Sequence, residues 1–157
     1  MTSRHSRAAP PPPDPDAGTW GGRSVARRFE SPDGLVVLVG RSAADNDVLT
    51  FKLAAPDDFW LHAAGTSGAH VVVRNPERLE RLPRDTQRFA AALAAAHSGA
   101  GGSGRIPVHV ATCRDVDKPR RAPPGTVTLR RSWTIRGLAD DVRLPPGTDR
   151  PGNDPSC

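Results

Sequence analysis

The sequence predicts a single compact α+β domain with a mixed or antiparallel sheet, about two helices and disordered tails. The chain has 157 residues, a length that suits one domain. Several short runs rich in Val, Ile and Leu read as strands, whereas only two segments have helical periodicity. The ends, 1–23 and 138–157, are rich in proline and poor in apolar residues, so they cannot offset their chain entropy by burial. We therefore expect the folded part at 24–137.

The first half of this domain is expected to contain a hairpin, a short helix and two more strands. Strands at 24–29 and 35–39 flank the turn sequence Ser-Pro-Asp-Gly at 31–34. Ser42 followed by Asp45 is typical of a helix N-cap with an acid in the first turn, and this helix would bury Val48, Leu49 and Leu53. Segments 58–62 and 70–74 are strand-like and are separated by a loop with two glycines.

The second half is expected to contain one longer helix and three strands. Pro83, Asp85 and Thr86 open the helix, and a glycine-rich segment at 99–104 ends it. The helix has period 3.6 in its apolar face, formed by Phe89, Ala90, Leu93, Ala94 and His97. Strands at 106–113, 126–130 and 133–136 complete the domain.

Positive charge is concentrated in the C-terminal half. The chain holds 22 Lys and Arg against 17 Asp and Glu, a formal net charge of +5. Residues 105–136 alone contain eight basic and two acidic residues, a net charge of +6, so the rest of the chain nearly cancels. Such a block is typical of a protein that binds nucleic acid.

The most distinctive part of this block is the segment 116–127, which we call the proline-framed loop. It contains three cations, Lys118, Arg120 and Arg121, and three prolines. Proline fixes φ, so the loop would lose little entropy on ordering and could present its cations to a polyanion. A solvated basic turn is the plainer alternative. Arg130 and Arg131 follow shortly and would extend the same basic surface.

A second candidate surface lies on the strand at 58–62. Alternation would place Asp58, Trp60 and His62 on one face of the sheet. Trp60 could stack on a base with His62 beside it, or Trp60 could be core and His62 could satisfy a buried carbonyl. Arg41 could contact a phosphate or pair with Asp47.

Several short motifs follow one another through the predicted domain, over about 26–136. They are Phe29 with Ser-Pro-Asp-Gly at 31–34, Gly40-Arg41, Asn46-Asp47 with Leu49-Thr50, Asp-Phe-Trp-Leu-His-Ala at 58–63, Gly-Ala-His-Val-Val-Val at 68–73, His97-Ser98 after the alanine-rich helix, and Val116, Lys118-Pro119, Ala-Pro-Pro-Gly at 122–125 and Val127. In order and spacing these motifs together resemble the NFACT-R domain, the RNA-binding domain of the NFACT proteins of ribosome-associated quality control.

The resemblance implies an RNA-binding module whose partners are tRNA or ribosomal RNA and the large ribosomal subunit. The family usually has a basic residue where this chain has Asp117 and a glycine where it has Arg121. The NFACT-N and coiled-coil regions of the long proteins are not in this sequence. We therefore expect a stand-alone version that does not elongate alanine tails or bridge ribosomal subunits.

Two other function classes stay open at this point. The domain could be a protein-interaction module that docks on ribosome-associated proteins through its basic surface. It could also be a His-dependent RNA-modifying enzyme, with candidate groups His62, His70, His97, His109, Asp57, Asp58 and Cys113. No motif with a catalytic or metal-binding mechanism is found, so we expect no enzyme activity, no metal and no cofactor.

The sequence also bears on the compartment. No run of about 18 apolar residues is present, and the N-terminus has no apolar signal region, so we expect no membrane association. Cys113 and Cys157 form neither a disulfide framework nor a zinc-binding pattern. We expect a cytoplasmic protein.

Overall fold

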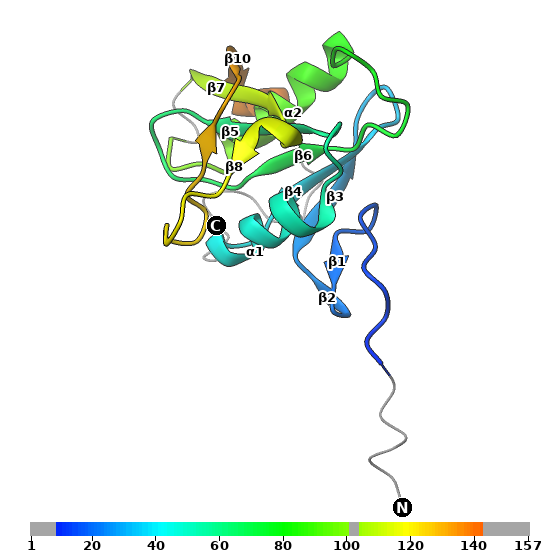
Figure 1. Ribbon diagram of the computed structural model, residues 1–157. Helices are drawn as coiled ribbons and strands as arrows, with labels where there is room; N and C mark the ends of the chain where they lie inside the picture. Colours follow the sequence, from blue (N-terminus) through cyan, green and yellow to red (C-terminus); the bar gives the residue numbers. More distant parts are fainter. Residues whose placement is uncertain (1–8, 101–103, 143–157) are drawn as a thin grey trace, which may run out of the picture.

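A computed structural model describes residues 9–100 and 104–142, and the predicted α+β domain is confirmed. Its centre is a six-stranded sheet in the order β10-β7-β5-β6-β4-β3, in which every neighbouring pair is antiparallel (Figure 1). The strands are β3 (Ala26–Glu30), β4 (Val36–Gly40), β5 (Phe59–Ala63), β6 (Val71–Val73), β7 (Arg105–Thr112) and β10 (Trp133–Leu138). Parts of the expected tails and of the glycine-rich segment, residues 1–8, 101–103 and 143–157, lie outside the described residues.

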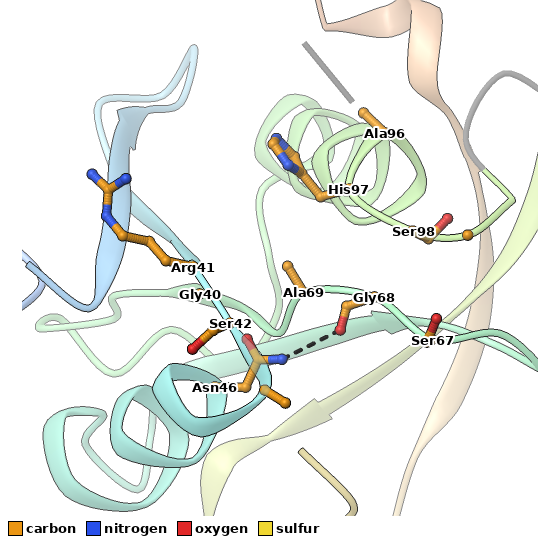
Figure 2. A pocket seen from close by; sticks show the side chains of 12 residues that line it. Gly40, Arg41, Ser42, Asn46, Ser67, Gly68, Ala69, Ala96, His97 and Ser98 are labelled. Atoms are coloured by element: carbon orange, nitrogen blue, oxygen red, sulfur yellow. Dashed lines mark hydrogen bonds between the residues drawn. The ribbon is translucent and has the colours of Figure 1, made fainter. Parts of the chain in front are cut away.

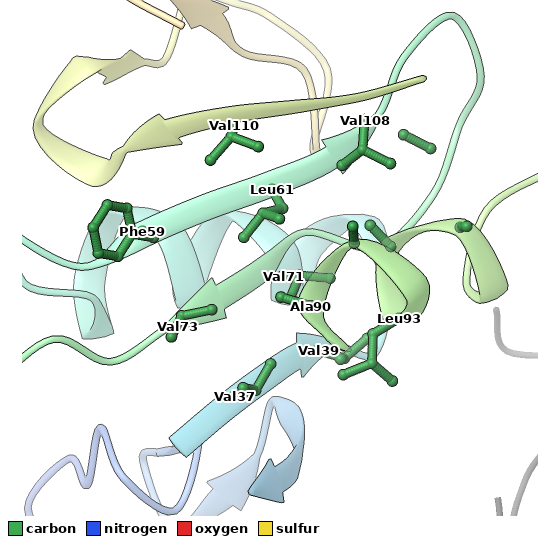
Figure 3. Packing of buried hydrophobic residues seen from close by; sticks show 14 of the residues in the cluster. Val37, Val39, Phe59, Leu61, Val71, Val73, Ala90, Leu93, Val108 and Val110 are labelled. Atoms are coloured by element: carbon green, nitrogen blue, oxygen red, sulfur yellow. The ribbon is translucent and has the colours of Figure 1, made fainter. Parts of the chain in front are cut away.

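One face of the sheet is covered by the long helix α2 (Arg84–Ala96), close to where the sequence predicts it. The helix places its alanines and Leu93 against alternate residues of four strands (Figure 3). These strand residues are Val37, Val39, Phe59, Leu61, Val71, Val73, Val108 and Val110. Alanine is the best helix former, and its small side chain lets the helix approach the valine-rich sheet closely.

The helix and the first hairpin fix each other. The N-cap of α2, Pro83, has no side chain that can cap the helix. Instead Asp33, in the β3–β4 turn, accepts hydrogen bonds from the Thr86 backbone N–H at 3.1 Å and from the Thr86 hydroxyl at 2.7 Å. The turn itself needs Gly34, which has φ +81°. The predicted hairpin is therefore confirmed, and its turn also caps the long helix.

The opposite face of the sheet is covered by the short helix α1 (Ala43–Val48) and by a small ribbon. Ser42 caps α1, as predicted, by accepting from the Asp45 N–H at 3.1 Å. The helix runs on into a π-helical turn, η2 (Leu49–Leu53), which buries Leu49. The ribbon pairs β8 (Val116–Asp117) with β9 (Thr128–Leu129), joined to β7 by the 3-10 turn η3 (Cys113–Asp115). Leu49, Val116 and Leu129 meet the second face of the sheet.

The ordered structure extends beyond the boundaries expected from composition. A hairpin of β1 (Thr19–Trp20) and β2 (Arg23–Ser24) lies inside the segment expected to be a tail. Gly18 is packed against Ala26 and Leu38, and Lys52 Nζ lies 5.3 Å from the centre of the Trp20 ring. At the other end β10 continues to Leu138, and a 3-10 turn, η4 (Ala139–Asp141), follows. Glycines with positive φ, not apolar residues, let the N-terminal segment fold back.

Candidate nucleic-acid interface

The proline-framed loop connects β8 to β9 and is built from two tight turns. In the first turn, the Ala122 N–H donates to Pro119 O at 3.1 Å, and in the second, the Thr126 N–H donates to Pro123 O at 3.1 Å. Arg121 has φ +62°, in the left-handed region where glycine is favoured. The family's usual glycine at this position therefore has a backbone reason, and this chain reaches the same conformation with an arginine.

Lys118 does not extend into solvent as the sequence interpretation expected. Its ammonium group donates to Pro123 O at 2.5 Å and Thr126 O at 3.0 Å and forms an ion pair with Asp47 at 3.1 Å. The side chain is only 29 % exposed. Lys118 thus closes the loop on itself and ties it to α1, and its charge is already neutralised by Asp47.

Two further side chains, Asp47 and His70, bind the backbone of the loop at Gly125. Asp47 also accepts from the Gly125 N–H at 3.1 Å. His70 is buried on β6's N-terminal side, with Nε2 3.1 Å from Gly125 O and Nδ1 2.8 Å from the Thr50 hydroxyl. Burial, first, and then the His62 ring lower the pKa of His70 to about 4, against the opposing effect of the Gly125 hydrogen bond, so the ring is neutral at pH 7. A neutral ring that donates from Nε2 to Gly125 accepts at Nδ1 from Thr50.

The Asn46-Asp47 motif is therefore the platform for the loop. Asn46 accepts from the His70 N–H at 3.0 Å and donates to Gly68 O at 3.3 Å. A Cβ on Gly40 would lie 2.0 Å from Asn46 Oδ1, so only glycine fits there. The sequence predicts for Asp47 only the alternative of a pair with Arg41. In the structure Asp47 contacts Lys118 and Gly125, which lie 71 and 78 residues further along the chain. In the sequence, only its place in the Asn46-Asp47 motif marks it.

Arg120 and Arg121 are the exposed cations of the loop. Both side chains are exposed, and neither forms an ion pair with any residue in the described part of the chain. Lys118, Asp47 and His70 fix the backbone beneath them, so the two guanidinium groups project from a loop of defined shape. Of the three cations that the sequence singles out in this loop, Arg120 and Arg121 are exposed and Lys118 is not.

Of the two arginines that follow the loop, Arg130 is held by other residues, as Lys118 is, whereas Arg131 is exposed, as Arg120 and Arg121 are. Arg130 pairs with Asp117 at 2.9 Å, its guanidinium donates to Arg114 O, and its backbone N–H donates to Asp115 O at 2.8 Å. These contacts join the end of β9 to β8 and to the turn η3. Arg131 is exposed and makes no ion pair within 9–100 and 104–142.

Arg41 lies at the side of a pocket of about 270 Å³ between α1 and the end of α2 (Figure 2). Its guanidinium Nε donates to the Ser24 hydroxyl at 3.0 Å, so the predicted alternative of pairing with Asp47 is not what the structure shows. Ser42, Ser67, His97 and Ser98 are among the residues that line the pocket. Arg41 is half-buried and keeps part of its surface accessible.

Trp60 belongs to the core. Strand alternation at 58–62 is as predicted, with Phe59 and Leu61 facing α2, but the opposite face is also covered, and Trp60 is 1 % exposed. Its ring cannot be offered to a base. His62 is half-buried and stacked on Trp60 with ring centres 5.8 Å apart. Burial, first, and then His109 lower the pKa of His62, so it is neutral at pH 7.

The candidate catalytic groups are dispersed or engaged. Asp58 is buried, accepts from the Ala55 and Asn75 N–H groups and pairs with Arg74, and burial raises its pKa. Burial also raises the pKa of the Cys113 thiol, which disfavours the reactive thiolate. Among the described residues there is no group of three or more His, Cys, Asp or Glu side chains able to hold a metal ion. Likewise, no described helix is long and apolar enough to cross a membrane.

Comparison with known proteins identifies this arrangement. The family model described as "NFACT protein RNA binding domain" matches residues 26–131. The chain is 40% identical over 111 residues to "Rqc2 homolog RqcH" of Bacillus subtilis (strain 168), covering 71% of this chain and 19% of that protein. It is 35% identical over 116 residues to "Rqc2 homolog RqcH" of Streptococcus suis (strain 05ZYH33), covering 73% and 20%.

The fold is shared with a solved structure, the C-terminal part of the fibronectin/fibrinogen-binding protein from Streptococcus suis. The TM-score is 0.68 at 33% identity, covering 74% of this chain and 46% of that one. The chain spans about a fifth of the length of the RqcH relatives it matches. The match takes in all strands of the central sheet except β10, together with both helices and the loop platform. The chain therefore belongs to the family of NFACT protein RNA-binding domains.

Proposed function

We propose that this chain binds RNA in ribosome-associated quality control, with phosphate contacts from the proline-framed loop. The observation that carries the proposal is the pair Arg120 and Arg121, which are exposed and form no ion pair among the described residues. Their loop is held by part-buried hydrogen bonds that join His70 and Asp47 to Gly125. Arginine forks match phosphate oxygens bidentately, and a fixed loop loses little entropy when they bind. Arg131 and the accessible part of Arg41 add to this surface.

The RNA is proposed to be tRNA or ribosomal RNA, in the cytoplasm and in contact with the large ribosomal subunit. The family match supports RNA as the class of ligand. We propose no catalytic role, because His70 is held by Thr50 and Gly125 and His62 is stacked on Trp60. His62 lies beneath the surface, and its proposed effect on RNA is to support the His70 ring, 5.6 Å away, rather than to contact a base.

The test is the salt dependence of RNA affinity. A protein that neutralises phosphates releases counterions, so log affinity falls linearly with log salt, with a slope of about −0.7 to −0.9 per phosphate. The double variant Arg120→Ala/Arg121→Ala should weaken binding to tRNA and rRNA fragments. It should also make the slope shallower by about one to two units.

A matched control removes the same charge elsewhere. Arg81 and Arg84 are exposed next to the start of α2, on the opposite side of the sheet, and form no ion pair among the described residues. The variant Arg81→Ala/Arg84→Ala should keep nearly the wild-type slope. Equal effects of the two double variants would show that only net charge matters. No binding at low salt by the wild-type chain would refute RNA binding and favour protein docking.

A further inference from the structure

Trp133, the first residue of β10, is a large aromatic side chain at the surface. It is 42% exposed, and among the described residues only Phe51 is another large apolar side chain that is exposed. Trp133 pairs in register with Val110, near the C-terminal end of β7 and at the start of β10. An exposed tryptophan offers a large flat face on which the ring of a ligand can stack.

The fold does not depend on this side chain. Trp133 is absent from both apolar clusters, whereas Ile135, two residues further along β10, packs against the α2 cluster. The register of β10 with β7 is set by backbone pairs from Trp133 to Leu138. The ring is therefore available for contact without loss of core packing.

An exposed cation lies close to Trp133 along the chain, since Arg131 precedes it by two residues. Arg130 reaches back to Arg114, and the Arg114 side chain is 53% exposed. Asp57 forms ion pairs with both Arg114 and Arg78, and the Arg78 Nε lies 3.5 Å from its carboxylate. One carboxylate therefore pairs with two cations. An exposed guanidinium two residues from an exposed aromatic ring favours a ligand with both phosphates and flat rings.

We propose that Trp133 is a base-stacking site for unpaired nucleotides, with Arg131 and Arg114 contacting the adjoining phosphates. This inference rests on the proposed RNA binding and adds to it a preference for single-stranded segments. Base stacking on an aromatic residue is sequence-tolerant, because every base has a π-face. Alternation along β10 places Trp133 on the α2 side of the sheet, opposite the proline-framed loop. An RNA that contacts both must pass over the β10 edge.

The experiment compares the full-length chain with Trp133→Ala and Trp133→Phe, using a uridine homopolymer and an RNA duplex of equal length. Trp133→Ala should weaken homopolymer binding by about 5- to 150-fold, and Trp133→Phe by less than about threefold. Duplex binding should change little in either variant. Phe51→Ala, which removes the other exposed apolar ring, is the matched control and should bind both RNAs as the wild type does.

Tryptophan fluorescence gives an independent readout. Trp60 is buried and Trp20 lies against Lys52, so quenching by the homopolymer should come from Trp133 and disappear in Trp133→Phe. Homopolymer affinity and quenching that are unchanged in the variants, with wild-type RNA binding intact, would overturn this inference alone. Absence of RNA binding by the wild type would instead refute the proposed function.

Discussion

Replacing Lys118 by methionine should separate the architecture of the proline-framed loop from its contact with RNA. Methionine keeps most of the apolar stem and removes the ammonium group. In the structure that group satisfies Pro123 O and Thr126 O and pairs with Asp47. Its loss removes the ammonium donor from Thr126 O, leaves Pro123 O with the Thr126 N–H, and leaves Asp47 with the Gly125 N–H.

The expected cost can be worked out from these contacts. Hydrogen bonds to a charged group contribute about 1.5–3 kcal/mol when buried, and partly exposed ion pairs about 1 kcal/mol or less. Lys118 is 29% exposed and Asp47 is 25% exposed, so water can replace part of what is lost. We expect Lys118→Met to lower the free energy of unfolding by about 2 kcal/mol. The variant Arg120→Ala/Arg121→Ala should change it by less than about 0.5 kcal/mol.

Urea denaturation measures the stability, and titration with tRNA at several salt concentrations measures the affinity. Lys118→Met should weaken RNA binding by loosening the loop, with a salt slope close to that of the wild type, because its charge is already paired. A stability equal to the wild type, together with a slope shallower by one unit, would refute this reasoning. Lys118 would then be a phosphate contact, as the sequence alone suggested.

Three further predictions concern other positions. His70 has a folded-state pKa of about 4, below its unfolded value of about 6.5, so the unfolded chain binds the proton more readily and stability falls as pH drops through this window. The wild type should lose about 2 kcal/mol between pH 7.5 and pH 5 in urea melts, and His70→Gln should be less stable at pH 7.5 but lose less over the same range. Arg121→Gly should raise stability by about 0.5–1 kcal/mol by relieving the positive φ, while it weakens RNA affinity, and a loss of stability would contradict this. Gly137→Ala should cost about 1–3 kcal/mol by calorimetry or urea melts, since its Cβ would meet the Ala91 carbonyl oxygen, and a neutral effect would be the contrary result.

The sequence predicts local structure correctly where the contacting residues lie close together in the chain. The Ser42 cap, the turn at 31–34 and the backbone hydrogen bonds within α2 all join residues a few positions apart, and each of these elements is where the patterns predict it. Alternation at 58–62 was also correct. It could not show that Trp60 is buried, because that requires knowing that α1, η2 and the β8–β9 ribbon cover the second face.

Long-range pairing was beyond sequence reasoning. The strand expected at 126–130 exists as β9, but it pairs with β8 in a separate ribbon. The sequence predicts Lys118 to be a free cation, since its partner Asp47 is 71 residues away in the chain. The N-terminal boundary was wrong for the same kind of reason. Composition predicted disorder up to residue 23, whereas Gly18 packs against Ala26 and Leu38 and β1 pairs with β2.

The position of β10 bears on how copies of this chain behave at high concentration. Among the described strands it is the last in the sheet, so one side of its backbone has no strand partner. Such an edge invites pairing with the same edge of a second molecule. Arg136 is exposed on β10 and Arg131 lies just before it, so two copies would bring like charges together. Polyanions or high salt screen this repulsion. The arginines therefore oppose self-association most strongly at low ionic strength.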